Sequence, residues 1–381
     1  MQRRTVLKVI GGSLVAVAGS ATAFLLTRDP ASARTPWAAA PAEADPRLFV
    51  LRHAILAPNP HNRQPWIIEL DGDSTANIFC DLDRRLPETD PLDRQILIGF
   101  GCFLELASIA AAEKGLELEI AYFPEGEPGE RLDSRPVARI TFKPSPAVVK
   151  EALFRQIAQR RSVKEPFDMA RPVAGALVSR LSGAAGAISV TGSVDPLLVE
   201  RLRKLTWEAW LTEAEGKATW MESVDLMRIG RSEIEANPDG IDLGGPLFDS
   251  LRLAGLMNRE ALADRSSQAY RSGAEVYREI MASSMGFLWW TSSDNSRKTQ
   301  LDAGRVFART HLQATEAGVH LHPVSQCLQE FPAMGPHLNG IHAMLGVDSP
   351  GRIQMLARLG YAAAKPQQSP RWPLEAKLKT T

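Results

Sequence analysis

A short basic segment offers the first side chains with evident chemistry. It contains Arg160, Arg161, Ser162 and Lys164 within five residues. Cations and a hydroxyl at this spacing can surround a dianionic phosphate with charge-assisted hydrogen bonds. The same residues also fit a solvated basic helix end, where the cations offset the helix dipole. The segment therefore indicates either a phosphate site or a helix terminus.

A second segment, APNPHNRQPW over residues 57–66, lies between an expected helix and an expected strand. Its prolines and asparagines favour an irregular loop whose amides and backbone groups can face a planar heterocycle. A turn that merely caps the neighbouring helix and strand is the alternative. The candidate binding residues of this loop are Asn59, Pro60, His61, Asn62 and Gln64.

Histidines near the C-terminal end raise the question of a metal site. His320 and His322 alternate on an expected strand and so share one face, and His337 and His342 follow. Imidazoles are common zinc ligands. Because no Asp, Glu or Cys shares their spacing, we expect no bound metal.

Together these segments resemble signatures of the nitroreductase family of flavoproteins. The loop resembles A-P-S-x-x-N-x-Q-P-W, with Asn59 in the place of serine. The basic segment resembles R-x-S-x-[RK]-x-F, with Pro166 inserted before Phe167. Residues 318–326, GVHLHPVSQ, resemble a family turn, G-[LI]-x-x-x-P-[IM]-x-[GE], although a Glu-Gly pair is frequent where this chain has Ser-Gln. The ending LGY at 359–361, followed by Arg371, also resembles the family.

The resemblance implies that FMN is the cofactor and that the flavin carries the electron chemistry, so no side chain is expected as a catalytic residue. In the family, the basic segment and the last arginine hold the phosphate, while the loop and the turn meet the flavin. The residues expected to bind FMN are Arg160, Arg161, Ser162, Lys164, Asn59, Pro60, His61, Asn62, Gln64, Pro323, Val324, Ser325, Gln326 and Arg371.

The resemblance further implies an FMN-dependent oxidoreductase that passes electrons to a nitroaromatic- or quinone-like small molecule. The donor stays open between NAD(P)H, a quinol and a redox protein. A second function also stays open. Residues 230–265 read as loop-rich and could form a lid over the flavin, which would make the protein a flavin-sequestering or storage protein without turnover.

An internal repeat is visible when residues 101–115 are placed over residues 304–318. Gly101 pairs with Gly304 and Gly115 with Gly318. Chance similarity of two alanine-rich helices is the alternative to duplication. The repeat, and a loop that precedes the basic segment, resemble the fused, double-length branch similar to the mycobacterial Acg proteins. One chain then mimics the family's homodimer and holds one complete FMN site.

The hydrophobic periodicity predicts a mixture of helices and strands. The resemblance and the repeat imply that these elements form an α+β fold that is nitroreductase-like and internally duplicated. The two long repeated helices are expected to pack against each other. The expected helices are 47–56, 91–115, 147–160, 172–182, 195–229, 270–283, 300–317 and 337–346. The expected strands are 66–71, 76–81, 116–123, 136–143, 187–192, 286–292 and 353–361, with a strand-like stretch at 319–324.

Residues 1–33 resemble a twin-arginine export signal. Arg3 and Arg4 precede an apolar run, and an A-x-A cleavage site ends at Ala33. A retained membrane anchor is the alternative. The twin-arginine translocase is thus an expected partner, and the periplasm or cell envelope the expected location. Because this pathway carries folded proteins, it also suits one loaded with a cofactor.

Composition limits the remaining possibilities. The 381 residues carry 44 basic and 44 acidic side chains, which argues against a nucleic-acid partner. Three separated cysteines exclude a disulfide scaffold. We expect a flexible linker over residues 34–45, a first half over 46–145 and a second half over 146–381. The expected assembly is a monomer that resembles a dimer, or a weak homodimer.

Overall fold

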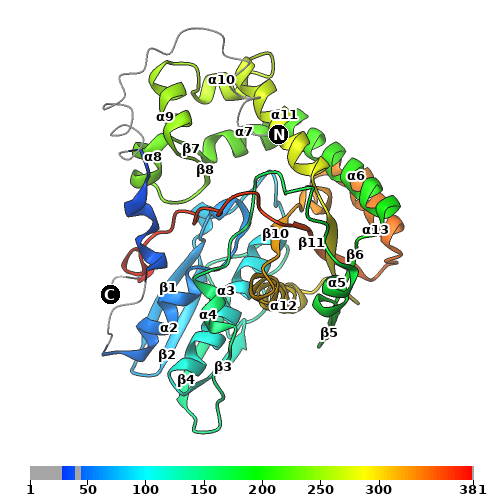
Figure 1. Cartoon of the computed structure of the whole chain (residues 1–381). Coiled ribbons are helices and arrows are strands. Elements are labelled where there is room, and N and C mark those ends of the chain that lie inside the picture. Colours follow the sequence, from blue (N-terminus) through cyan, green and yellow to red (C-terminus); the bar gives the residue numbers. More distant parts are fainter. Residues whose placement is uncertain (1–27, 39–43, 380–381) are drawn as a thin grey trace.

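The computed structural model describes residues 28–38 and 44–379. The expected signal motif and apolar run lie within residues 1–27 and therefore outside the described residues. The described chain has an α+β fold, as expected: two antiparallel sheets lie on either side of a pair of long helices, and a helical layer covers one end (Figure 1).

The first sheet belongs to residues 66–144 and has the strand order β1-β2-β4-β3. Strand β3 alternates buried or half-buried residues with exposed ones, the pattern of a sheet with one solvated face. Helix α3 is buried almost all round and forms the centre of this half. The elements are α2 Pro46–Ala54, β1 Trp66–Asp71, β2 Thr75–Cys80, α3 Arg94–Glu113, β3 Leu116–Tyr122 and β4 Ala138–Pro144.

The second sheet has the order β10-β11-β9-β6-β5. If β6, β9, β11 and β10 are equated with β1, β2, β4 and β3, both sheets have one strand order, as a duplicated unit requires. The elements are α4 Phe154–Ile157, α5 Gly175–Leu181, β5 Gly183–Ala185, β6 Ile188–Ser193, β9 Gly286–Ser292, α12 Arg297–Glu316, β10 His320–Pro323, α13 Gly335–Leu345 and β11 Arg352–Gly360.

Helices α3 and α12 cross at the pair of glycines that the repeat aligns. A Cβ atom on Gly101 would lie 2.0 Å from the Leu301 carbonyl oxygen, and one on Gly304 would lie 2.0 Å from that of Ile98. The two contacts are reciprocal, since each carbonyl stands three residues before the opposite glycine. The prediction that these helices pack against each other is confirmed. Although α3 is long and apolar enough to cross a membrane, it is buried in the core.

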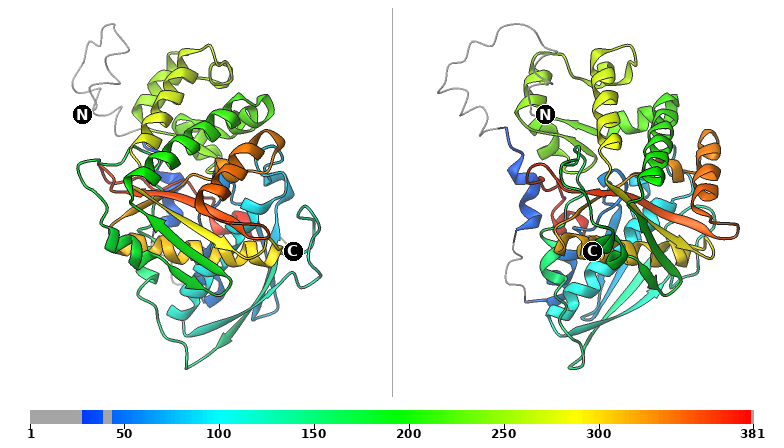
Figure 2. Two further views of the ribbon diagram at one scale, coloured as in Figure 1. Left: turned by 90° about the vertical axis from the view of Figure 1, so that its right-hand side faces the viewer. Right: turned by 45° about the vertical axis from the view of Figure 1, so that its right-hand side comes forward.

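The connection between β6 and β9 contains the helical layer of Figures 1 and 2, which we call the insert, residues 196–282. In the first half the matching strands, β1 and β2, are joined by a tight turn at Gly72. The insert consists of α6 Pro196–Glu215, α7 Lys217–Leu226, β7 Met227–Ile229, α8 Gly230–Ala236, β8 Ile241–Leu243, α9 Pro246–Leu253, α10 Arg259–Ala263 and α11 Gln268–Ala282.

Three local predictions are wrong. Residues 230–265 are not loop-rich, because Pro246 begins α9 and the Asn258 side chain caps α10. The helix expected over 147–160 shrinks to Phe154–Ile157, and the β-branched residue Val149 is exposed before it. The helix expected over 195–229 is interrupted at Gly216, whose backbone is extended.

The segment after the expected signal is partly ordered, contrary to the flexible linker expected over 34–45. Residues Ala31–Trp37 form a 3-10 helix, η2, in which Ala33 and Trp37 are each 5% exposed. The Arg371 amide donates to the Ala33 carbonyl at 2.8 Å, and the Trp37 indole donates to the Ser369 carbonyl at 2.8 Å. An apolar indole and two long-range hydrogen bonds fix this segment. The expected cleavage site at Ala33 lies inside η2.

Candidate functional site

The loop over residues 57–66 has a tightly defined conformation. The Asn59 side-chain oxygen accepts a hydrogen bond from the Gln64 amide at 2.7 Å and closes the loop on itself. His61, Asn62 and Gln64 all have positive φ angles, a sparsely populated conformation for residues with a Cβ atom. Such strain is found preferentially at binding sites. The alternative of a plain helix-to-strand turn does not explain three strained residues.

The C-terminal segment holds this loop in place. The Asn62 side-chain amide donates to the Pro370 carbonyl at 2.9 Å, and Arg371 donates to the Asn62 side-chain oxygen. The Trp372 amide donates to the Gln64 side-chain oxygen at 2.9 Å. Asn62 and Gln64 therefore meet the segment of Arg371, which lies about 300 residues further along the chain.

Three arginines gather beside this loop, and we call them the arginine cluster: Arg160, Arg161 and Arg371. Both Arg160 and Arg371 donate to the Leu56 carbonyl oxygen, at 2.9 and 3.4 Å. The Trp37 ring lies 5.7, 5.1 and 5.3 Å from the guanidinium carbons of Arg160, Arg161 and Arg371. These are cation–π distances. The cluster joins segments from four distant parts of the chain.

The arginine cluster has more donors than the described protein uses. The Nε atoms of all three arginines are buried and have no hydrogen-bond partner within the described residues. The three side chains also form no ion pair with any described carboxylate, although Asp242 lies close enough to act on Arg371. Burial lowers the pKa of Arg160 and Arg161 to about 10 and that of Arg371 to about 9. Buried cations with unsatisfied donors fit a bound anion, and a phosphate group suits their geometry and charge.

Ser162 and Lys164, the other predicted residues of the basic segment, do not belong to the arginine cluster. Ser162 pairs with Leu321 through a backbone bridge. Lys164 is half-exposed and forms an ion pair at 3.4 Å with Asp242 on β8 of the insert. A solvated helix end does not describe Arg160, which is 2% exposed. The structure therefore separates the predicted phosphate residues into a largely buried arginine cluster and a half-exposed lysine.

The turn at residues 323–326 has hydrogen-bond partners of its own. Pro323 ends β10, the buried Val324 donates its amide to the Leu356 carbonyl at 2.9 Å, and the Ser325 hydroxyl donates to Gln95 at 3.1 Å. Gln326 begins the 3-10 helix η5, Gln326–Leu328. Within the described residues, no hydrogen bond links these four residues directly to the arginines.

The four histidines weighed as metal ligands contact other groups, His320 among them, which accepts from the Ala362 amide at 3.3 Å. The His322 Nδ1 atom accepts a hydrogen bond from Arg358 at 2.9 Å, and the Ile353 amide donates to His342 at 3.0 Å. His337 contacts Thr212 at 2.8 Å. In the part of the chain that the structure describes, no group of three or more potential ligands could hold a metal ion.

A buried polar chain connects the loop with the segment after the turn. The side-chain amide of Gln329 donates to the Glu213 carboxyl group at 2.8 Å. The Ser223 hydroxyl oxygen lies 3.3 Å from both the Glu213 carboxyl group and the His61 Nε2 atom. Glu213 is 4% exposed, and burial raises its pKa to about 7. Burial lowers the pKa of His61 to about 4, helped by the charges of Lys164 and Arg63. His61 is therefore a neutral imidazole at pH 7.

The insert also lies directly on the loop. The Gly240 amide donates to the Asn62 carbonyl at 3.3 Å, and the Gln64 side chain donates to the Pro238 carbonyl at 2.8 Å. Asp239 is buried and pairs with Arg63 at 3.3 Å. The segment 237–240 thus covers the loop that carries five of the fourteen residues expected to bind FMN. It belongs to the expected lid range, although that range is largely helical.

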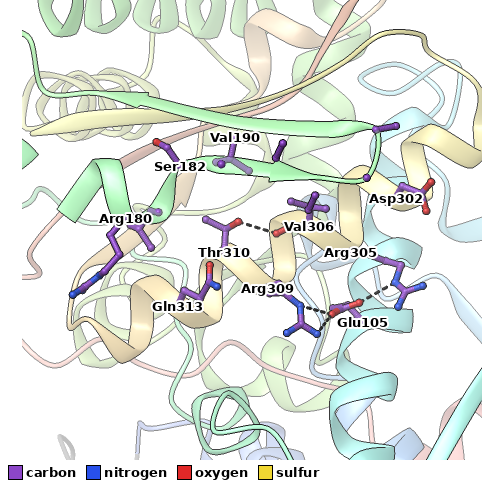
Figure 3. A pocket seen from close by; sticks show the side chains of 16 residues that line it. Glu105, Arg180, Ser182, Val190, Asp302, Arg305, Val306, Arg309, Thr310 and Gln313 are labelled. Carbon is purple, nitrogen blue, oxygen red and sulfur yellow. Dashed lines mark hydrogen bonds and ion pairs between the residues drawn. The ribbon is translucent and has the colours of Figure 1, made fainter. Parts of the chain in front are cut away.

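The second half contains a hollow in a position related to the loop. It has a volume of about 450 Å³ and lies between the chain at 182–187 and one face of α12 (Figure 3). Like residues 57–66, this chain follows a helix and precedes the matching strand of its sheet. Here the cations are neutralised, since Arg305 and Arg309 donate to Glu105 at 2.9 and 2.8 Å. Arg305 and Arg309 therefore lack the unpaired charge of the arginine cluster, although the exposed Arg180 also lines the hollow.

Two residues of the site, Trp37 and Glu213, were not predicted from the sequence. Trp37 lies in a stretch rich in Ala and Pro, where its isolated aromatic ring is the only signal. Glu213 follows Thr206, Ala209 and Trp210 at helical spacing on the buried face of α6. A carboxylate on an otherwise apolar helical face is a signal of this kind, because burying an ionised group is costly.

Comparison with known proteins gives a partial sequence match. No family model matches the chain. A putative NAD(P)H nitroreductase, acg, of Mycobacterium tuberculosis H37Rv is 36% identical over 118 residues, which are 30% of this chain and 33% of that protein. An uncharacterized protein of the same strain is 31% identical over 128 residues, 31% of this chain and 36% of that protein. The match thus spans about a third of each relative, and over that part the chain has nitroreductase-like homology.

Solved structures give a weak overall likeness. An FMN and NADPH-dependent nitroreductase, NfnB, from Sphigopyxis sp. strain HMH is 16% identical, covers 61% of this chain and 99% of its own, and has a TM-score of 0.36. A nitroreductase with bound FMN from Bacteroides fragilis is 12% identical, covers 57% of this chain and 92% of its own, and has a TM-score of 0.32. The α+β description above rests on this chain's own elements.

Proposed function

We propose that the protein is an FMN-dependent oxidoreductase of the nitroreductase type. One observation carries the proposal: Arg160 and Arg371, which are buried, and Arg161, which is half-buried, converge beside a strained loop, and their three buried Nε donors have no partner within the described residues. An anionic ligand satisfies these donors and offsets the repulsion among the cations. The terminal phosphate of FMN is such a ligand, and the partial match to a putative nitroreductase supports this choice.

Different residues of this chain would contact different parts of FMN. The arginine cluster would bind the phosphate, and Asn59, His61, Asn62 and Gln64 would contact the rest of the molecule from the loop. Trp37 and the C-terminal segment hold the arginines in place. The bound flavin would supply two-electron transfer to an acceptor, while the protein orients the reactants and excludes water.

The acceptor and the donor are proposed at the level of chemical class. A nitroaromatic- or quinone-like acceptor follows from the resemblance to nitroreductases. NAD(P)H is a donor supported by the name of the matched relative, and a quinol or a redox protein would serve in the cell envelope. Export by the twin-arginine translocase, with the folded chain carrying its flavin, belongs to the same proposal.

The absorbance spectrum of the natively purified protein tests this function. Flavin bands near about 370 and 450 nm are expected, and they should bleach anaerobically when NAD(P)H or a quinol is added and return when a quinone is added. A colourless protein that also fails to bind added FMN would contradict the proposal.

Flavin sequestration is a second candidate, favoured by the contacts of residues 237–240 with the loop. If the insert shuts the site permanently, the bound flavin keeps its spectrum but no donor bleaches it. The Asp239→Asn variant loosens this contact, because Asp239 pairs with Arg63, Arg84 and Arg228. Bleaching in that variant alone would favour sequestration, whereas bleaching of the wild type excludes it.

A further inference from the structure

The polar chain through Glu213 is the buried group of the site that flavin binding does not explain. It runs from Gln329 to Glu213, then to Ser223 and His61. One end, Gln329, lies just after the turn at residues 323–326, and the other end, His61, lies in the loop at residues 57–66. Its middle two residues come from α6 and α7 of the insert. This series of hydrogen-bonded side chains therefore links the loop, the insert and the segment that follows the turn.

Both ends of this chain have unused polar atoms. The His61 Nδ1 atom and the Gln329 Oε1 atom are buried and have no hydrogen-bond partner among the described residues. A buried polar atom without a partner is costly and calls for an explanation. His61 lies next to Asn62, which binds Arg371 of the arginine cluster. A polar ligand atom at His61 Nδ1 would thus belong to the same site as the phosphate.

Glu213 has no described cation to stabilise its ionised form. The groups that face it are Ser223 and Glu222 on α7, Gln329 after η5, Tyr277 on α11 and, through Ser223, His61 on the loop. His337 on α13 contacts the neighbouring Thr212. None of these groups is a permanent cation, and Glu222 adds repulsion. A carboxyl group in such surroundings keeps its proton near neutral pH.

We propose that Glu213, acting through Ser223 and His61, is the positioning residue that supplies a proton for the reduction of a quinone-class acceptor. The inference rests on the proposed function, which provides the hydride. Ser223 would donate its hydrogen to His61 Nε2, so that the neutral imidazole carries its own hydrogen on Nδ1. The acceptor oxygen would then be the missing partner of that atom.

The proposed step balances in atoms and electrons. Reduction of a quinone to a hydroquinone takes up one hydride, with both electrons, and one proton. The Nδ1–H bond of His61 breaks as the proton binds the quinone oxygen. At the same time a proton moves from Ser223 to His61 Nε2, and another from Glu213 to Ser223. Glu213 is left as a carboxylate, and a proton taken from water at His61, with the reverse shift, restores it.

The Glu213→Gln variant tests this step in the full chain loaded with FMN, because glutamine keeps the hydrogen-bonding shape but cannot release a proton. With a water-soluble benzoquinone as acceptor, the wild-type rate should fall as the pH rises above about 7. The variant should be about 100-fold slower at pH 6 and independent of pH. Glu215→Gln, an exposed position on the same helix, is the control and should keep the wild-type profile.

A second measurement uses the protein without acceptor. Because the folded pKa of Glu213 is raised above its usual value of 4.5 to about 7, its contribution to stability is complete below pH 4.5 and is lost as the pH rises through 7. The urea midpoint of the wild type should therefore fall between pH 5 and pH 8 by more than that of Glu213→Gln. Equal pH dependence in both proteins would contradict a protonated Glu213.

The outcomes separate the two proposals. A wild type that binds no FMN overturns the proposed function and the proton step together. A wild type that binds FMN and reduces the quinone, with an unchanged pH profile in Glu213→Gln, overturns the proton step alone. If Glu213→Gln fails to fold, Ser223→Ala replaces it: this variant should lose the rate but retain the pH dependence of the urea midpoint. Full activity in Ser223→Ala would also overturn the step.

Discussion

Arg160 and Arg371 show how a binding residue differs from a structural arginine. Both are almost completely buried, and each spends only part of its guanidinium group on protein carbonyls. The double variant Arg160→Ala/Arg371→Ala should abolish FMN retention. Each charge-assisted hydrogen bond contributes about 1.5–3 kcal/mol, so losing two corresponds to at least about a hundredfold weaker binding. Flavin content after desalting, read by absorbance, measures this directly.

A matched control comes from the hollow of the second half. Arg180 lines it and is exposed, so Arg180→Ala removes a cation without touching the arginine cluster. This variant should keep its flavin. Full flavin occupancy in the Arg160/Arg371 double variant would refute the phosphate assignment, and loss of flavin in Arg180→Ala would show that total positive charge matters more than position.

Residues from two separate motifs come together in the structure. Asn62 and Gln64 of the loop contact Arg371 and Trp372 of the C-terminal segment, while their assignment to FMN stays a prediction. Lys164 instead pairs with Asp242 at the edge of the site. That partner belongs to the insert, which the motif does not describe. Trp37 and Glu213 depend on packing between distant segments, and no local pattern records such packing.

Among the elements, the crossing of α3 and α12 requires glycine at two positions, Gly101 and Gly304. Gly101→Ala should destabilise the protein by about 3 kcal/mol, because the new Cβ atom would lie 2.0 Å from the Leu301 backbone carbonyl. Backbone cannot rotate away as a side chain can, so the two helices would have to separate. Urea unfolding followed by circular dichroism measures the loss.

Gly340→Ala is the matched helical control for this crossing. Gly340 lies on helix α13, and a Cβ atom there would meet only the Leu205 side chain, at an ordinary contact distance of 3.7 Å. Alanine is the better helix former by about 1 kcal/mol, so this variant should unfold at the same or a higher urea concentration. Equal midpoints for Gly101→Ala and the wild type would mean that the close crossing does not contribute to stability.

Element prediction succeeded where periodicity was long and failed where short segments depend on their neighbours. Helices α3, α11 and α12 and most of the strands lie within a few residues of their predicted bounds, whereas the helix predicted over 195–229 is divided at Gly216. The region 230–265 carries many turn residues, yet it forms short helices whose ends are set by Pro246 and Asn258. Such helices are stabilised by capping and by contacts with the rest of the insert, which composition alone does not reveal.

At the scale of the whole molecule, the chain carries two sheets of one strand order around one pair of helices. Each half buries its long helix against the other, so neither half has an unpaired apolar helix face at the crossing. The halves differ most between β6 and β9, where the second half has the insert and the first half has a tight turn. The insert contacts the loop of the first half.

The asymmetry of the halves predicts one FMN per chain. The arginine cluster has buried donors without partners, whereas Arg305 and Arg309 in the related hollow are neutralised by Glu105. An FMN phosphate entering the hollow would meet that carboxylate as well as the two cations. Flavin released by denaturation should therefore equal the chain concentration, and sedimentation should give a monomer, because the second half already covers the crossing face of α3. Two flavins per chain would contradict the assignment of a single site, and a stable dimer would require another surface.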